Sequence, residues 1–389
     1  MSNSADIIER TDRYTTPNYA RSQVVFVRGQ GRRLWDADGR CYLDLLAGIG
    51  VASLGYGHPA VVRAIQEQAE RLLHTSNLFY HEPGADLAER LVENTFADRV
   101  FFCNSGAEAN EAAIKMARRA MGDRHEIITV ENSFHGRTLG ALAATGQGAL
   151  QEGFGPMPDG FIHVGYGDAS NIAARIGAHT AAVMLEPVLG EGGVVVPPPG
   201  YLQAVRKLCD DAGVLLILDE VQTGNGRSGR LYAHELSDIT PDILTTAKGL
   251  AGGLPIGAVL ATEETGQAFV PGTHGSTFGA NPVAAAAAVA VIDALKGGVI
   301  DNVVAVSKHL RAGLEKLAAT REDIVEVRGL GLMLGIEFTQ PTKPIVAQLL
   351  AEGVIANATA GNVLRLLPPL TLTIAEADEA LGAIHKVLP

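Results

Sequence analysis

The sequence predicts an α/β fold, in which helices cover a mostly parallel sheet and a smaller α+β unit accompanies it. Apolar runs alternate with helical segments through the middle of the chain, and each run ends in a polar or glycine-rich turn, as in RVFFCNSG, EIITVENSFHG, AAVMLEPVLGEGG and GVLLILDEVQTG. That alternation is typical of parallel sheets. The 389 residues are enough for a large α/β domain with a smaller companion.

The individual elements follow from local patterns. RRLWDADGRCYLDLL predicts a hairpin around Asp38-Gly39, and PAVVRAIQEQAERLLH and YLQAVRKLCDDAG predict helices. Near the end, DNVVAVSKHLRAGLEKLAAT predicts a helix, whereas VEVRGLGLMLGIEF and VLRLLPP predict short strands. We expect residues 1–60 to join the small domain, residues 61–284 to form the large domain and residues 285–389 to form the rest of the small α+β domain.

Composition and charge narrow the class of protein. Hydrophobic residues make up 47% and charged residues 19%, which excludes wholesale disorder. The net charge of −12 argues against nucleic acid or an anionic membrane surface as a partner, because both need a cationic footprint. The N-terminus lacks the apolar core of a secretory signal. We expect the apolar stretch from Pro282 to be a buried alanine-rich helix, because it is too short for a membrane span.

The cysteines and the ends of the predicted strands bear on the kind of site. Cys41, Cys103 and Cys209 are far apart without a CxxC pair, so we expect neither disulfides nor a zinc site, and a cytoplasmic location. Asp219 and Glu220 follow the apolar run LLIL, at the edge where open α/β sheets bind ligands. Adjacent strand residues point to opposite faces, so only one of the two acids faces a ligand. A metal-dependent hydrolase is the alternative, but no histidine cluster supports it, and we expect no metal.

Two further features combine with Asp219. Ser105 and Glu108 have capping-box spacing, and Gly106 begins a predicted helix whose free N–H groups suit an anion, although an ordinary capping box has the same pattern. Lys248 follows ILTTA and precedes a glycine-rich loop, where it is either a Schiff-base amine or a solvated lysine. An anion cradle, an amine and a carboxylate are the three groups that pyridoxal phosphate requires.

The segment GNGRSG, residues 224–229, favours a different cofactor. It matches the dinucleotide fingerprint of NAD-dependent oxidoreductases. However, DEVQT separates the strand from the glycines, and the following RLYAHELSDITPD does not predict the helix that should hold the pyrophosphate. This oxidoreductase interpretation therefore remains a distant alternative.

Eight motifs in order resemble the class III pyridoxal-phosphate aminotransferases: SNLFYHEP, NSGAEANEAAIKMAR, ENSFHGRTLGAL, EPVLGEGG, LILDEVQTGNGRSG, AKGL, HGSTFGANP and LRLLPPLT. The resemblance covers nearly everything after about residue 12. Each motif alone is unspecific, but their joint order is specific. The resemblance implies the fold type I architecture of this enzyme class, with pyridoxal 5'-phosphate as cofactor.

Site residues are carried over from the family by matching motif positions. Lys248 corresponds to the Schiff-base lysine and Asp219 to the partner of the pyridine nitrogen, and both are expected to be catalytic. The other residues expected to bind the cofactor are Ser105, Gly106, Ala107, Phe134, His135, Val221, Gln222 and Thr277. Thr277 corresponds to a residue that reaches the phosphate from the neighbouring subunit, so the resemblance implies a homodimer with shared active sites.

The substrate class follows from a second set of matched positions. The residues expected to bind substrate are Arg137, Glu191, Arg365, Ile49 and Ser276. The two arginines suit carboxylates, because a guanidinium binds a carboxylate in bidentate fashion. The glutamate is implied to pair with Arg365 while the amine donor is bound and to release it for 2-oxoglutarate.

Ile49 lies where related free-ornithine enzymes have a tyrosine, and an aliphatic residue there suits an α-amide. We therefore expect N-acetylornithine as the donor. Succinylornithine, N-acetyl- or carrier-linked lysine, ornithine and 4-aminobutyrate remain open.

Overall fold

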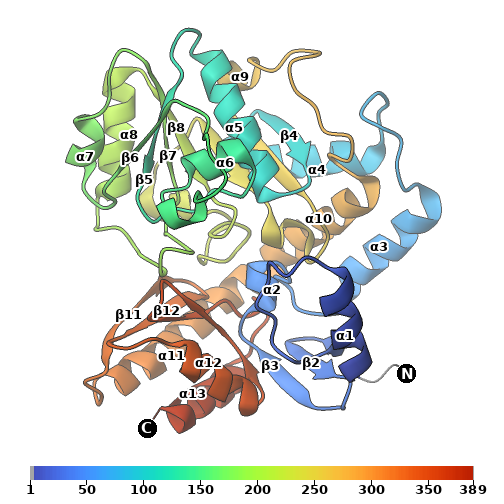
Figure 1. Cartoon of the computed structure of the whole chain (residues 1–389). Helices are drawn as coiled ribbons and strands as arrows, with labels where there is room; N and C mark the ends of the chain where they lie inside the picture. The colour runs from blue at the N-terminus through green and yellow to red at the C-terminus, as the bar shows by residue number, and fades with distance from the viewer. Residues whose placement is uncertain (1–3, 389) are drawn as a thin grey trace.

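A seven-stranded sheet forms the centre of the upper part of the molecule in Figure 1. The structure is a computed structural model that describes residues 4–388. The strand order is β4-β10-β9-β8-β7-β5-β6, and β10 is antiparallel to both neighbours while the other pairs are parallel. The strands are β4 (Arg99–Cys103), β5 (Glu126–Val130), β6 (Phe161–Val164), β7 (Thr180–Leu185), β8 (Leu215–Asp219), β9 (Ile243–Thr246) and β10 (Gly257–Ala261). The predicted mostly parallel sheet is confirmed.

Helices cover the two faces of this sheet, and side-chain alternation decides which strand residues meet them. In β8, Ile217 belongs to the apolar cluster formed with α5 (Gly106–Ala120), whereas Leu216 and Leu218 belong to the cluster formed with α8 (Tyr201–Ala212). Asp219 therefore shares the face of Ile217 and points toward α5. Shorter helices complete this part: α6 (Leu139–Ala144), α7 (Ala169–Ala173) and α9 (Glu263–Gly266).

Two smaller sheets lie in the lower part of Figure 1, where the blue N-terminal and red C-terminal segments are neighbours. One has the order β1-β2-β3-β13 and joins the N-terminal hairpin to a C-terminal strand through the parallel pair β3 and β13. The other has the order β11-β12-β15-β14. Their strands are β1 (Phe26–Gln30), β2 (Arg33–Asp36), β3 (Cys41–Asp44), β11 (Ile324–Leu330), β12 (Met333–Phe338), β13 (Val354–Ile355), β14 (Asn357–Thr359) and β15 (Val363–Leu366). The predicted hairpin around Asp38-Gly39 is confirmed.

The remaining α-helices precede, separate or follow the strands of these sheets along the chain. They are α1 (Ser4–Tyr14), α2 (Ala47–Gly50), α3 (Pro59–Arg71), α4 (Glu82–Glu93), α10 (Pro282–Ala294), α11 (Ile300–Ala318), α12 (Lys343–Ala351) and α13 (Ile374–Val387). From the pairing of β3 with β13, we propose that residues 1–60 and 285–389 form one unit beside residues 61–284.

The stretch Pro282–Ala318, which contains α10 and α11, is long and apolar enough to cross a membrane by length and composition alone. However, α10 packs against α3 and α4, and its alanines from Ala284 to Ala288 are largely buried inside the protein. The predicted buried alanine-rich helix is confirmed.

The glycine-rich loop 224–229 does not precede a long helix. It is followed by the short 3₁₀ turn Ala233–Ser237, so it lacks the helix N-terminus that a dinucleotide site needs. Arg227 in this loop is buried, and its Nη1 donates to the carbonyl oxygens of Leu332 at 2.9 Å and Pro368 at 2.6 Å. Leu332 lies in the turn between β11 and β12, and Pro368 lies just after β15. Arg227 therefore ties the loop after β8 to the sheet β11-β12-β15-β14.

Replacing Arg227 by methionine is expected to lower the free energy of unfolding by about 3 kcal/mol, because two buried carbonyl groups lose their donors. Calorimetry of the purified variant would show this as a lower melting temperature. Arg230→Met in the same loop is the control, because Arg230 is exposed. Equal melting temperatures for the two variants would contradict the role given to Arg227.

Candidate active site

Several chain segments reach one edge of the large sheet, where the parallel strands have their carboxyl ends. Lys248 follows β9, Asp219 ends β8, and Phe134 lies in the loop after β5. The helix α5 begins at this edge, with two residues between it and the end of β4. A cavity of about 240 Å³ lies here. It is lined by Gly106, Ala107, Asn110, Phe134, His135, Gly136, Arg137, Glu186, Glu191, Asp219, Val221, Gln222 and Lys248.

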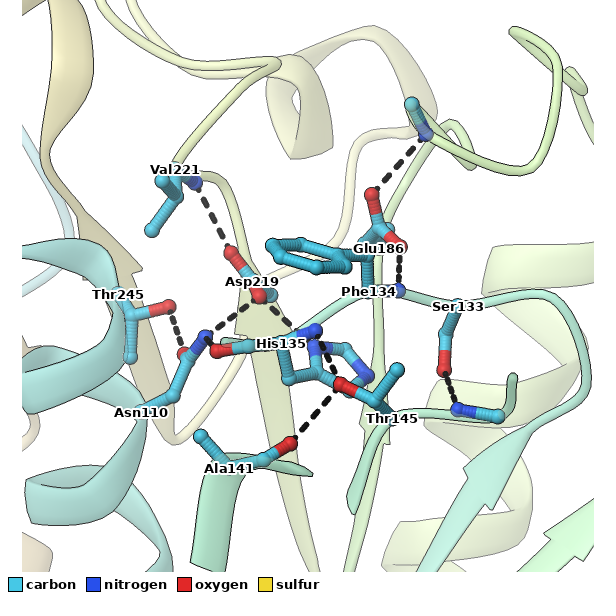
Figure 2. A network of polar contacts seen from close by, with 12 residues as sticks. Asn110, Ser133, Phe134, His135, Ala141, Thr145, Glu186, Asp219, Val221 and Thr245 are labelled. Carbon is cyan, nitrogen blue, oxygen red and sulfur yellow. Dashed lines mark hydrogen bonds and ion pairs between the residues drawn. The ribbon is translucent and has the colours of Figure 1, made fainter. Parts of the chain in front are cut away.

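Asp219 is the most densely bonded carboxylate of the cavity. Its Oδ2 lies 2.7 Å from Asn110 Nδ2 and 2.7 Å from His135 Nδ1, and its Oδ1 accepts from Val221 N at 3.1 Å. Figure 2 shows Asn110, His135 and Asp219 converging from α5, the loop after β5 and β8. Asn110 is itself oriented, because Thr245 Oγ1 donates to its Oδ1 at 2.7 Å. The carboxylate is therefore held in one orientation at the cavity wall.

Lys248 is half-buried and lines the cavity, so it is not a solvated surface lysine. Its φ of +41° is in the left-handed region, which is uncommon for a residue other than glycine and concentrates at functional sites. Burial lowers the pKa of Lys248, and the charge of Arg365 lowers it further, while Glu191 and Asp219 act in the opposite direction. The amine is thus less basic than an ordinary lysine.

The predicted anion cradle lies at the start of α5. Ser105 Oγ accepts from the backbone N–H of Glu108 at 3.2 Å, as the capping-box spacing predicts, and Glu108 Oε2 accepts from Asn104 N at 3.0 Å. A side chain on Gly106 would place its Cβ 2.7 Å from Val221 Cγ1. Glycine therefore lets the helix N-terminus approach Val221 closely at the cavity wall.

Arg365 is fully buried and reaches toward the cavity from β15 of the small domain. Its Nη1 donates to Glu191 Oε1 at 2.6 Å and to Gln222 Oε1 at 3.2 Å. Within residues 4–388, its Nη2 has no hydrogen-bond partner although it is buried. Burial raises the pKa of Glu191, but the charge and hydrogen bond of Arg365, the charge of Lys248 and the hydrogen bond of Gln222 together outweigh burial, so this pKa lies below its usual value. Arg365 thus favours the carboxylate form of Glu191, and its Nη2 is a buried donor without a partner in the described residues.

The structure places the remaining predicted residues at or outside the cavity mouth. Arg137 is exposed, lines the cavity and lies 5.8 Å from the centre of the Phe134 ring. Ser276 Oγ accepts from Asn104 Nδ2 at 3.1 Å, next to the cradle. Thr277 and Ile49 are exposed and are not among the residues that line the cavity.

Three polar residues at the cavity or bonded to its lining were not predicted from the sequence: Asn110, Thr245 and Glu186. Asn110 bonds Asp219 and Thr245 orients Asn110, and the sequence context of these two residues carries no signal of this. Glu186 did carry a signal, because it is an acid directly after the apolar run AAVML, as Asp219 is after LLIL. Within the described residues, no group of three or more His, Cys, Asp or Glu side chains is arranged to hold a metal ion.

Comparisons with known proteins agree with this geometry. A family model described as "Aminotransferase class-III" matches residues 14–388. The acetylornithine aminotransferase of Caldanaerobacter subterraneus subsp. tengcongensis is 47% identical over 97% of this chain and 97% of its own length. That of Mycobacterium tuberculosis is 50% identical over 95% of this chain and 93% of its own length.

Solved structures are similar as well. The ornithine aminotransferase from Toxoplasma gondii matches with a TM-score of 0.96 and 36% identity, covering 100% of this chain and 95% of that chain. A second structure of that enzyme, with a TM-score of 0.95, 36% identity and coverage of 100% and 94%, is described as having partial occupancy of PLP at its active site.

Proposed function

We propose that this chain, which belongs to the class III aminotransferases, transfers the ω-amino group of N2-acetyl-L-ornithine to 2-oxoglutarate. The products are N-acetyl-L-glutamate 5-semialdehyde and L-glutamate, a step of arginine biosynthesis. The observation that carries the proposal is one cavity lined by Lys248, Asp219 and Glu191, and Glu191 is paired with the buried Arg365. Relatives that are 47% and 50% identical over nearly their full length and are named acetylornithine aminotransferase support the choice of substrate.

The cavity suits pyridoxal 5'-phosphate as cofactor. An amine of lowered pKa, an oriented carboxylate and the N-terminus of a 15-residue helix open on one space. Lys248, Asp219 and Gln222 would hold its aldehyde, ring nitrogen and phenolic oxygen. The two ring faces would contact Phe134, which has His135 beside it, and Val221. The phosphate would be bound by the cradle Ser105, Gly106 and Ala107, together with Thr277 of a neighbouring subunit. When bound, the cofactor supplies a carbonyl for amine exchange and a ring that withdraws electrons.

The side chains of this chain then have distinct roles. The Lys248 amine has a lowered pKa, which favours its neutral form, so it can accept a proton from the substrate carbon that carries the amino group and return it. Asp219, fixed by Asn110 and His135, stabilises a positive charge at the far end of the cavity. Because Asp219 is held by these buried contacts, it requires little reorganisation during the reaction.

The Glu191–Arg365 pair allows one pocket to accept two substrates in turn. While the donor is bound, Glu191 neutralises Arg365 and avoids a buried charge without a counter-ion. When 2-oxoglutarate enters, one of its carboxylates would replace Glu191 on the guanidinium, so that the same pocket can hold the keto acid that accepts the amino group. Ser276 and Arg137, at the mouth of the cavity, are proposed to bind the other end of the substrate. This exchange supports a ping-pong mechanism.

Wild-type protein is expected to use N-acetylornithine with a higher kcat/KM than ornithine, and Ile49→Tyr should shift this ratio toward ornithine by about tenfold. A tyrosine hydroxyl can bond the free α-amino group, and one charge-assisted hydrogen bond accounts for about this factor. Steady-state rates with both donors measure the ratio. Val62→Tyr is the control, because Val62 is a similarly exposed aliphatic residue on α3. A wild-type preference for ornithine, succinylornithine, an acylated lysine or 4-aminobutyrate would replace the proposed donor.

We also propose a homodimer in the cytoplasm as the active form. The consecutive apolar residues Leu78, Phe79 and Tyr80 are 84%, 67% and 105% exposed. The neighbouring Asn77 Nδ2 donates to the carbonyl oxygens of Ser276 and Gly279, so this apolar segment lies beside the loop that carries Thr277. An exposed apolar segment of this kind suits contact with a second copy of the chain, and such a contact would bring Thr277 close to the active site of that copy. The three free cysteines fit a reducing compartment.

A further inference from the structure

Glu186 is a second buried carboxylate of the cavity, and none of the roles above uses it. It follows β7 directly and therefore lies between the loops that follow β5 and β8, the strands on either side of β7. The residue is only 5% exposed and lines the cavity. A buried carboxylate needs partners for its oxygens, and their identity indicates what it does.

Both oxygens of Glu186 accept hydrogen bonds from backbone groups, one in the loop after β5 and one four residues further along its own loop. Oε1 accepts from Phe134 N at 2.8 Å, and Oε2 accepts from Gly190 N at 3.0 Å. Figure 2 shows these two contacts on opposite sides of the carboxylate. Phe134 carries a ring of the cavity wall, and Gly190 directly precedes Glu191, the partner of Arg365. One side chain thus joins the cofactor wall to the substrate switch.

We propose that Glu186 is a positioning residue that holds the Phe134 ring and the Gly190–Glu191 loop at a fixed separation across the cavity. The inference rests on the proposed function, because it assigns Glu186 a part in cofactor and dicarboxylate binding. Gly190 leaves little room for an alternative arrangement, since a Cβ there would lie 2.5 Å from Gln222 Oε1. The loop is therefore fixed from both sides, by Glu186 and by Gln222.

The ionisation of Glu186 makes the stability of the protein depend on pH, and this dependence can be measured without catalysis. Burial raises the pKa of Glu186 to about 7; the charge of His135 lowers this pKa, and the charge of Asp219 raises it. The charge of Glu186 in turn raises the pKa values of Lys248 and Tyr166. Since the folded pKa is above the unfolded value of 4.5, the stability linked to Glu186 is full below pH 4.5 and is lost as pH rises through about 7. In Glu186→Gln, the melting temperature of the cofactor-free chain should fall less over this range than in the wild type.

The main test compares Glu186→Gln and Glu186→Ala with the wild type in the full chain. Hydrogen exchange measured by mass spectrometry without cofactor should increase in residues 131–138 and 186–193, more for alanine than for glutamine. The affinity for pyridoxal phosphate should fall about tenfold and the KM for 2-oxoglutarate should rise about tenfold, because loss of one such hydrogen bond corresponds to about a tenfold change. The kcat should change by less than about threefold, since this residue positions others and does not react.

Glu220 offers a matched control. It is fully buried on the neighbouring strand end and also accepts from two backbone groups, Ala233 N at 2.5 Å and His234 N at 2.9 Å, but it does not line the cavity. Glu220→Gln should increase exchange near residues 230–236 and leave cofactor affinity and KM unchanged. If the Glu186 variants change exchange without changing affinity or KM, Glu186 is structural only and the proposal is wrong.

The outcomes also separate this inference from the proposed function. Wild-type protein that binds pyridoxal phosphate but does not deaminate N-acetylornithine would remove the proposed donor, while the exchange and affinity comparisons would still decide the role of Glu186. Wild-type protein that binds no pyridoxal phosphate would overturn both.

Discussion

Lys248→Ala is expected to lower kcat/KM by at least ~10⁴-fold, because the covalent and the proton-transfer roles of this amine are lost together. Alanine also removes the side chain whose pKa burial and Arg365 depress. The variant should still bind pyridoxal phosphate without a covalent bond, since Asp219 and the start of α5 remain in place. Visible absorption spectra and rates with N-acetylornithine and 2-oxoglutarate measure the two effects.

Lys207→Ala is the control for this experiment. Lys207 is exposed on α8 and pairs with Asp211 there, so its loss should leave turnover unchanged. Near-normal turnover in Lys248→Ala would show that another amine performs the reaction. A variant that retained no cofactor at all would show that covalent attachment, rather than the rest of the cavity, provides the binding energy.

Asp219→Asn is expected to lower kcat/KM by roughly 10³-fold, because a neutral amide cannot stabilise a positive charge as a buried carboxylate does. Asn110 and His135 can still donate to the remaining oxygen, but the new NH₂ group would face Val221 N, which now donates to Oδ1. We therefore expect a small loss of stability beside a large loss of rate. Circular dichroism and steady-state kinetics measure the two effects.

Asp242→Asn is a suitable control, because Asp242 accepts from Leu216 N at 2.7 Å and pairs with Arg206 near the opposite edge of the same sheet. This variant should lose stability without a comparable loss of kcat. If Asp219→Asn retained full activity, the contact to the ring nitrogen would have to come from another group. If both variants lost activity in proportion to stability, Asp219 would be a structural residue.

Much of the fold could be predicted because it depends on local patterns. The runs VFFC, IITV, AAVML and LLILD are apolar enough to be buried on both faces, and each is found as a strand of the seven-stranded sheet. The family resemblance is confirmed by the match over residues 14–388, and with it the aminotransferase fold. The candidate site residues stay predictions, but the structure brings Lys248, Asp219 and Phe134 to one cavity.

Sequence by itself thus determined the strands, the helix that starts at Gly106 and the residues at strand ends, because each depends on neighbours a few positions away. Only the tertiary structure decided which strand ends are adjacent, through the order β9-β8-β7-β5. That order places Glu186 beside the loop of Phe134, and the position of β15, in another sheet, brings Arg365 to Glu191 across 174 positions of sequence. Such contacts arise from packing whole sheets and helices together, and no local propensity encodes the resulting pairs of buried charges.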